Sequence, residues 1–246
     1  MLRIIAVIYM MMCISMVGAA NESRSILRYN LDKEGGWVPF DSTDDPERPG
    51  VFIELIPLLM EYAEIDAVEY NLPTKRGVVA LFKGNLDFDF VNPQWVSEEE
   101  AKDFVFSIAI LPVTENFIAL AENQHMAQDT QQIYGKLVGT VAGYYYYDDD
   151  LFKRADFRSE SEVMLGLAHK RFDVAIMEQT AARYWSKIHQ VPIALGAVHT
   201  QGDIVLRLRA EKKFLLPRIN HAIEMLHQQN TINEILEHYV GTVQGN

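Results

Sequence analysis

The stretch Phe172-Asp-Val-Ala-Ile-Met-Glu178 decides how this chain folds. The run from Phe172 to Met177 is apolar and of strand length, which predicts a buried β-strand, and residues 178–188 then follow a helical pattern. A buried strand followed directly by a helix is the repeating unit of α/β proteins. Ligands of open α/β sheets lie outside the carboxyl ends of the strands, so Glu178 is a candidate for holding a ligand cation. The alternative is an exposed helix-start charge, which the helix dipole favours.

The residues before this stretch predict the rest of one α/β lobe. Residues 161–169 have the apolar spacing of a helix, and Leu137-Val-Gly-Thr-Val141 predicts a strand that ends near Gly143. Tyr144 and Tyr145 follow that turn and are expected to line this lobe. The polar residues 122–132 come earlier and predict a boundary between two lobes.

The first half of the chain predicts a second α/β unit. Its expected elements alternate between strands and helices, which predicts a parallel sheet covered by helices. The expected strands are residues 25–30, 66–73, 86–91, 104–110 and 115–120, and the expected helices are 52–62 and 76–83. Near the C-terminus, Pro217 and the capping-box sequence at Thr231 each begin a helix with an apolar stripe.

Aromatic side chains cluster just after the first predicted strand. Tyr29, Trp37 and Phe40 would stand at its carboxyl end and could wall a ligand pocket. Alternatively, these rings only cover the sheet edge. The acidic loop at residues 41–49 lacks the spacing of a calcium site, so a solvated turn is expected there and no metal site is predicted.

Residues 1–20 have the order of a secretory signal peptide. Arg3 precedes an apolar run from Ile4 to Val17, and Gly18-Ala-Ala20 follows it. We expect cleavage after Ala20, with Ala19 as the alternative. An uncleaved anchor is the other interpretation, although the run is shorter than the roughly 20 residues of a membrane span. The only cysteine, Cys13, lies in this leader, so the exported body would carry no thiol.

The composition argues against several classes of function. With 34 acidic and 22 basic residues the net charge is −12, which disfavours nucleic acids and anionic membranes. The sequence contains no nucleophile-elbow, zinc-protease, Walker or dinucleotide-binding motif. We therefore expect no cofactor and no enzymatic activity.

The order of these motifs resembles the periplasmic solute-binding proteins of family 3, which serve ABC transporters of polar amino acids. The resemblance spans nearly the whole chain after the leader. It is carried by residues 37–40, 49–55, 73–76 with 84–87, 106–107, 135–139, 143–144 and 170–173 followed by Glu178.

The resemblance implies a two-lobed α/β fold of type II, in which two crossover segments join the lobes and a ligand binds in the cleft. The crossovers would fall near residues 118–122 and 201–205. One lobe would then comprise residues 21–119 plus 204–246, and the other residues 120–203. The acidic residue at the position of Glu178 would hold a ligand ammonium.

One expected residue is absent. The family places an arginine for the ligand carboxylate after the third strand, where this chain has Glu99 or Glu100. A carboxylate has the wrong charge and no donors for that task. Arg76, or amides near Gly143, would have to supply the contact.

The resemblance implies an exported, monomeric periplasmic protein that binds a small polar ligand, amino-acid-like or cationic, for uptake through an ABC permease. One alternative is a periplasmic sensory module that reports to a membrane sensor. Another is a dehydratase-like enzyme on the same fold, with Glu178 as general acid.

Overall fold

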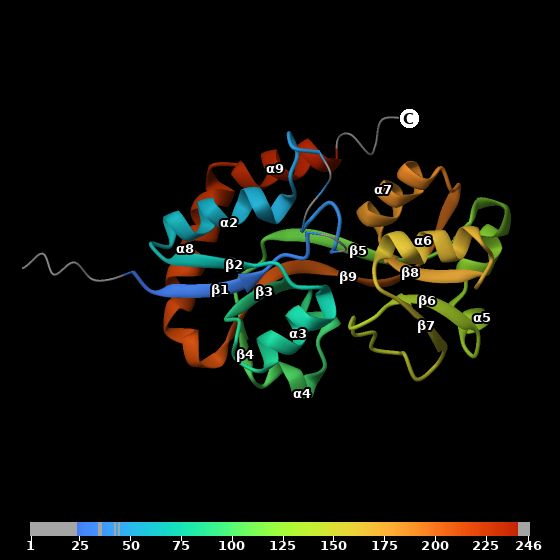
Figure 1. The fold of residues 1–246 in the computed structure, drawn as a ribbon, viewed down its shortest axis with the longest axis horizontal. Helices are drawn as coiled ribbons and strands as arrows, with labels where there is room; N and C mark the ends of the chain where they lie inside the picture. Colours follow the sequence, from blue (N-terminus) through green and yellow to red (C-terminus); the bar gives the residue numbers. More distant parts are fainter. Residues whose placement is uncertain (1–23, 34–35, 42, 44, 241–246) are drawn as a thin grey trace, which may run out of the picture.

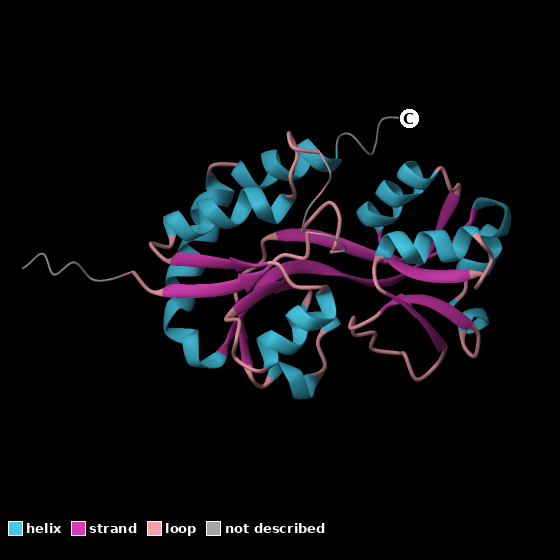
Figure 2. Ribbon diagram, in the orientation of Figure 1, coloured by secondary structure: helices cyan, strands magenta, loops and turns pink. Residues whose placement is uncertain are grey.

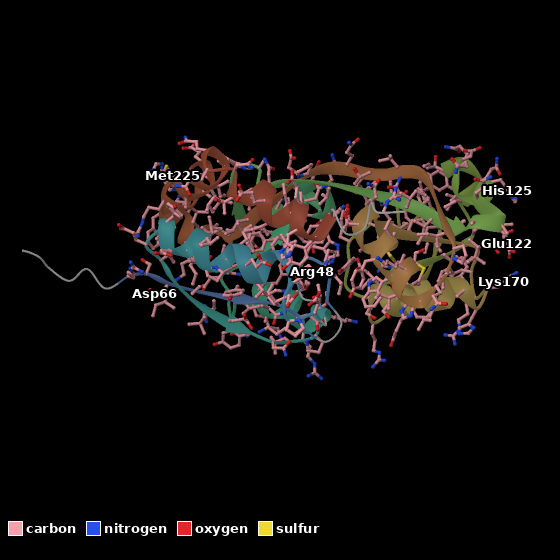
Figure 3. The ribbon with its side chains drawn as sticks, turned by 90° about the horizontal axis from the view of Figure 1, so that it is seen from above. Arg48, Asp66, Glu122, His125, Lys170 and Met225 are labelled. Carbon is pink, nitrogen blue, oxygen red and sulfur yellow. The ribbon has the colours of Figure 1, made fainter. Side chains whose placement is uncertain are left out.

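The computed structural model describes residues 24–33, 36–41, 43 and 45–240. The predicted signal peptide lies outside these residues. None of the helices in the described part of the chain is long and apolar enough to cross a lipid bilayer. Lys170 and Glu122 lie at one end of the molecule, where they pair at 2.9 Å, and Asp66 lies at the opposite end (Figure 3).

The chain forms two α/β lobes that share one pair of long strands (Figure 1). The first lobe is built from both ends of the described chain. Its elements are β1 (Ile26–Asn30), α2 (Val51–Tyr62), β2 (Asp66–Tyr70), α3 (Thr74–Phe82), β3 (Phe88–Val91), α4 (Glu98–Ala101), β4 (Phe104–Phe106), α8 (Leu216–Gln228) and α9 (Thr231–Val240).

The second lobe is built from one continuous segment. Its elements are α5 (Thr130–Ile133), β6 (Leu137–Val141), β7 (Lys153–Phe157), α6 (Glu160–Ala168), β8 (Val174–Glu178) and α7 (Gln179–His189). Short 3₁₀ turns lie between consecutive elements of the chain, at Pro93–Trp95, Ala121–Ala127 and Ala210–Leu215. Figure 2 shows helices on both sides of the central strands.

The long strands β5 (Leu111–Leu120) and β9 (Ile193–Arg209) run antiparallel through both lobes. In the first lobe β9 pairs with β3 and β4, and in the second β5 pairs with β8. The register of β5 against β9 shifts on either side of Asn116, where the strands pass from one lobe to the other. Such bulges add bend and twist to a strand.

The seven-stranded sheet is therefore mixed rather than purely parallel, and β1 and β2 form a separate two-stranded sheet. The expected parallel pairing holds for β1 with β2 and for β6 with β7 and β8. It does not hold for β3, which pairs antiparallel with β9, because the returning strand β9 fills the place beside it. The proposed lobe bounds of 21–119 plus 204–246 and 120–203 stay a prediction.

The helices cover the sheets with apolar faces. In α2 the buried side chains recur at helical spacing, at Phe52, Leu55, Ile56 and Leu59. Helix α2 packs against α8 and α9, so the C-terminal helices complete the first lobe. In the second lobe α6 packs against α7 and β6. This arrangement leaves the ends of β1, β3, β6 and β8 directed at the space between the lobes.

Candidate ligand-binding site

A cavity of about 180 Å³ lies between the two lobes. Side chains of both lobes and of the crossover strand β5 form its wall. The first lobe contributes, among others, Asn30, Asp32, Trp37, Asp41, Phe52, Thr74, Asp89, Phe90, Trp95, Glu100 and Arg207. The second lobe contributes Gly143, Tyr144, Tyr145, Glu160 and Glu178, and β5 contributes Glu115.

Glu178 ends strand β8 and caps helix α7. Its Oε2 accepts hydrogen bonds from the backbone amides of Thr180 at 2.7 Å and Ala181 at 3.0 Å. Burial raises the pKa of this carboxyl to about 7, although those amides act in the opposite direction. One carboxylate thus satisfies the first amides of α7 and also faces the cavity.

Glu160 is the first residue of α6 and lies on the same side of the cavity. Its side chain is only 3% exposed. The buried indole nitrogen of Trp185 lies near it and lowers its pKa, but no described donor meets Oε2 with full hydrogen-bond geometry. Burial raises its pKa well above the usual range, and the nearby carboxylates of Glu178, Asp41 and Glu115 add to this effect. A buried, unpaired carboxyl oxygen costs free energy unless a donor reaches it.

Asp41 brings a third carboxyl group from the first lobe. It accepts a hydrogen bond from the backbone amide of Trp37 at 3.2 Å. Burial raises its pKa to about 7, and the carboxylate of Asp32 contributes. The loop at residues 41–49 was expected to be a solvated turn, but Asp41 at its start lines the cavity and accepts the hydrogen bond of the Trp37 amide.

Glu115 stands at the bulge of β5 and is held by a buried histidine. His199 Nδ1 lies 2.7 Å from Glu115 Oε2, and its Nε2 lies 2.8 Å from Asp148 Oδ1. Burial opposes the charged imidazole, but the two carboxylate hydrogen bonds outweigh it and raise the pKa of His199 to about 9. This charged network joins β5, β9 and the loop that carries Tyr144.

Aromatic rings form the wall of the cavity in the first lobe. Trp37 and Trp95 meet edge to face, with their centroids 5.4 Å apart, and Phe52 stacks on Phe90 at 4.2 Å. The Trp95 indole nitrogen donates to Thr200 Oγ1 at 2.7 Å, which fixes the ring in place. These rings offer apolar faces and π-electrons to a ligand.

The one basic side chain lining the cavity in the described residues is already paired. Arg207 Nη2 and Nε donate to the two carboxylate oxygens of Asp89 at 2.6 and 2.9 Å. The guanidinium also lies over the rings of Phe82 and Phe104. A bidentate pair of this kind leaves little net positive charge for a ligand.

The structure brings together four of the seven residues expected at the site. Trp37, Tyr144, Tyr145 and Glu178 line the cavity.

The other three expected residues lie outside the wall. Tyr29 stacks on Phe88 at 5.3 Å, and its hydroxyl donates to Glu69. Phe40 is buried behind Trp37, on which it stacks at 4.0 Å. Arg76 is exposed on α3 and does not line the cavity.

Sequence reasoning missed three of the carboxylates that line the cavity, Asp41, Glu115 and Glu160. A signal existed for Glu160, because Ser159 before it is a helix cap, and the start of a helix is directed at the cleft in such folds. No group of three or more His, Cys, Asp or Glu side chains in the described ranges could hold a metal ion.

No family model matches the sequence, and no curated protein matches it. Solved structures, in contrast, resemble the fold over nearly its whole length. An arginine-binding protein of T. maritima has a TM-score of 0.74 and 17% identity, covering 89% of this chain and 97% of its own. An amino-acid ABC transporter substrate-binding protein of Streptococcus pneumoniae, bound to L-arginine, has a TM-score of 0.74 and 14% identity, covering 90% and 97%.

A third solved structure that resembles the fold is related to an enzyme. An ancestral amino-acid-binding protein, described as a precursor of cyclohexadienyl dehydratase, has a TM-score of 0.71 and 16% identity, covering 87% and 95%. All three of these structures are binding-protein folds, and each shares less than 20% sequence identity with this chain. The chain therefore has the two-lobed α/β fold of the amino-acid-binding proteins of ABC transporters.

Proposed function

We propose that this protein is an exported solute-binding protein that captures a small polar ligand between its lobes and delivers it for ABC-type uptake. The observation that carries the proposal is the cavity itself, since side chains of both lobes contribute to its wall. A ligand touching both walls would favour the closed arrangement of the lobes. The protein acts by binding and release, without chemical turnover.

The size of the cavity supports a small ligand. Its volume of about 180 Å³ is below the roughly 300 to 1,000 Å³ of pockets for drug-sized molecules. The neighbouring folds include proteins bound to arginine and to glutamine and a putative cystine transporter. We therefore expect a ligand of about amino-acid size.

The partner that reads the closed state is either an ABC permease with its ATPase or a membrane sensor. We propose that the protein acts in the periplasm, because residues 1–20 have the order of a signal peptide, and as a monomer, because both lobes of one chain line the cavity. A gene for a permease beside this one would support transport, whereas a receptor gene alone would support sensing.

The function is tested on protein secreted to the periplasm and purified from it. A thermal-shift screen would include amino acids, amines, sugars and organic acids. A ligand present at about 100 times its dissociation constant stabilises the protein by roughly 2.7 kcal/mol, which raises the melting temperature by about 5 to 10 °C. Small-angle scattering should then show a more compact molecule with that ligand. A silent panel, or an unchanged scattering profile at saturation, would count against the proposal.

A dehydratase-like enzyme is the second candidate, and one observation favours it. The pKa of Glu178 is raised to about 7, which suits a general acid near neutral pH. If the protein is an enzyme, a bound compound should be consumed on incubation, and Glu178→Gln should stop turnover while binding persists. Mass spectrometry of the recovered ligand distinguishes the two candidates, because a binding protein returns it unchanged.

A further inference from the structure

The wall of the cavity is strongly acidic. Seven of its side chains are carboxylic acids and one, Arg207, is basic, among the residues that the structure describes. The acids are Asp32, Asp41, Asp89, Glu100, Glu115, Glu160 and Glu178. Asp89 neutralises Arg207 and the charged His199 lies beside Glu115, so the negative charge that a ligand meets comes from the other acids. A cation beside Glu160 and Glu178 would favour the ionised form of these carboxyls, whose pKa burial raises.

The places where an amino-acid carboxylate could bind are occupied. The amides of Thr180 and Ala181 at the start of α7 already bind the Glu178 carboxylate. Glu100 lies in the wall near the position where the resemblance expects an arginine, and its carboxylate accepts hydrogen bonds from Ser97. A ligand carboxylate would therefore meet like charges and few free donors.

Glu160 supplies the independent sign of a missing partner. Its Oε2 is buried at the cavity wall, and the nearby Trp185 indole does not meet it with full hydrogen-bond geometry, so both atoms remain unsatisfied among the described residues. Buried polar atoms in proteins are almost always hydrogen-bonded. An ammonium or guanidinium group brings donors and positive charge together and would satisfy this oxygen.

The aromatic wall favours an organic cation over a metal ion. Trp37, Trp95 and Phe90 line the cavity from the first lobe, whereas Glu160 and Glu178 line it from the second. Aromatic faces attract alkylammonium and guanidinium groups and also bury their methylene chains. The two walls together therefore suit a molecule with a cationic end and an apolar stem.

We propose that the cavity binds an organic cation, an amine or guanidine compound without a carboxylate, whose charged group contacts Glu160 and Glu178 and whose stem packs on Trp37 and Trp95. This inference rests on the proposed function and specifies its ligand class. The like-charged wall excludes ordinary α-amino acids, because their carboxylate would be left without a partner.

Agmatine and L-arginine form a matched pair of probes, because agmatine is arginine without its carboxylate. Isothermal titration of the secreted protein at pH 8 should give agmatine at least about 100-fold tighter binding than L-arginine, since like-charge contacts cost several kcal/mol. Equal or tighter binding of L-arginine would overturn the ligand class and leave the proposed function standing.

The variant Glu160→Gln tests the contact directly. Loss of one charge-assisted hydrogen bond should weaken agmatine binding by roughly 10- to 100-fold. Glu162→Gln is the control, because Glu162 lies on the same helix and pairs outside with Arg158. An equal effect of both variants, or none of either, would contradict the assigned contact.

The remaining outcomes separate the two proposals. If agmatine and 1,4-diaminobutane both fail to bind while a neutral solute binds, the cationic class is overturned and solute binding is retained. If no compound of the panel binds, the proposed function is overturned together with its ligand class.

Discussion

The carboxyl group of Glu160, which we propose to contact the ligand, lowers the stability of the ligand-free protein. It is buried close to Glu178, and the pKa of each carboxyl is raised above its usual range. A carboxyl whose folded pKa is raised destabilises the folded state once the pH exceeds its unfolded pKa. The ligand-free protein therefore carries a penalty at neutral and higher pH.

Glu160→Gln should accordingly raise the melting temperature of the ligand-free protein at pH 8, by about 2 to 4 °C for each kcal/mol of relieved repulsion. Glu162→Gln should change it by less, because exposed ion pairs contribute only about 0 to 1 kcal/mol. Differential scanning calorimetry measures both. A lower melting temperature for Glu160→Gln would mean that its carboxyl stabilises the fold.

His199 predicts a pH dependence of opposite sign. Its folded pKa of about 9 lies above the unfolded value of 6.5, so its contribution is fully present below pH 6.5 and is lost as the pH rises through 9. The difference corresponds to at most about 3 kcal/mol. The groups that face the imidazole are Glu115, Asp148, Phe117, Tyr146 and Tyr147.

Urea unfolding at pH 6.5, 8 and 9.5 measures this contribution. Above pH 8, the carboxyls of Asp41 and Glu178 are ionised in both states, whereas Glu160, whose pKa is raised further, can still titrate. The part of the loss between pH 8 and 9.5 that belongs to His199 is therefore measured against the variant that lacks the imidazole. The variant His199→Gln should show a flatter profile over this window. Parallel profiles of the two proteins would show that the imidazole is not charged in the folded state.

At the residue scale, the sequence predicted groups at strand ends but not those that tertiary folding turns inward. Glu178 follows a buried strand, so its place at the cavity could be predicted. Asp41 lies in an acidic loop that the sequence predicts to be solvated. Its hydrogen bond with the Trp37 amide forms only in the folded protein and holds it at the cavity. Glu115 lies within a strand, where a bulge specific to the β5 and β9 pairing orients it.

At the scale of elements, most helices and strands and the parallel pairing of strands could be predicted, but the antiparallel pairing of β9 could not. Helices α2, α6 and α8 follow periodic apolar faces, which depend on local sequence. Strand β9 runs for 17 residues, yet Gly196, Gly202 and its polar centre interrupt the pattern that would have revealed it. Its antiparallel pairing with β3 depends on residues more than a hundred positions apart.

The packing of β6 gives a prediction at this scale. A methyl group added at Gly139 would lie 2.3 Å from the ring of Phe172, which also packs against Gly166. Gly139→Ala should therefore destabilise the protein by about 1 to 3 kcal/mol, the usual cost of overpacking a core. Urea unfolding measures this loss. It should shrink in a Phe172→Leu background, and an equal loss there would rule out the contact with this ring.

The whole molecule predicts a processed, exported protein. The protein is expressed with its first 20 residues in a bacterium that secretes. The periplasmic product should have the mass of a chain that begins at Asn21, or at Ala20 if the alternative site is used. Intact-mass spectrometry of the periplasmic fraction checks this outcome. An unprocessed chain in the membrane fraction would instead support the anchor interpretation.

The shared pair of long strands also determines the order in which the polypeptide can become structured. Between Ala121 and His189 the chain contains every helix of the second lobe and its strands β6 to β8, so these contacts are short in sequence. The first lobe, in contrast, needs β9 beside β3 and α8 and α9 beside α2. Contacts between distant residues form later because closing long loops costs entropy. We therefore expect the second lobe to fold first during synthesis. The first lobe, which begins near the N-terminus, can be completed only after the C-terminal helices have been synthesised.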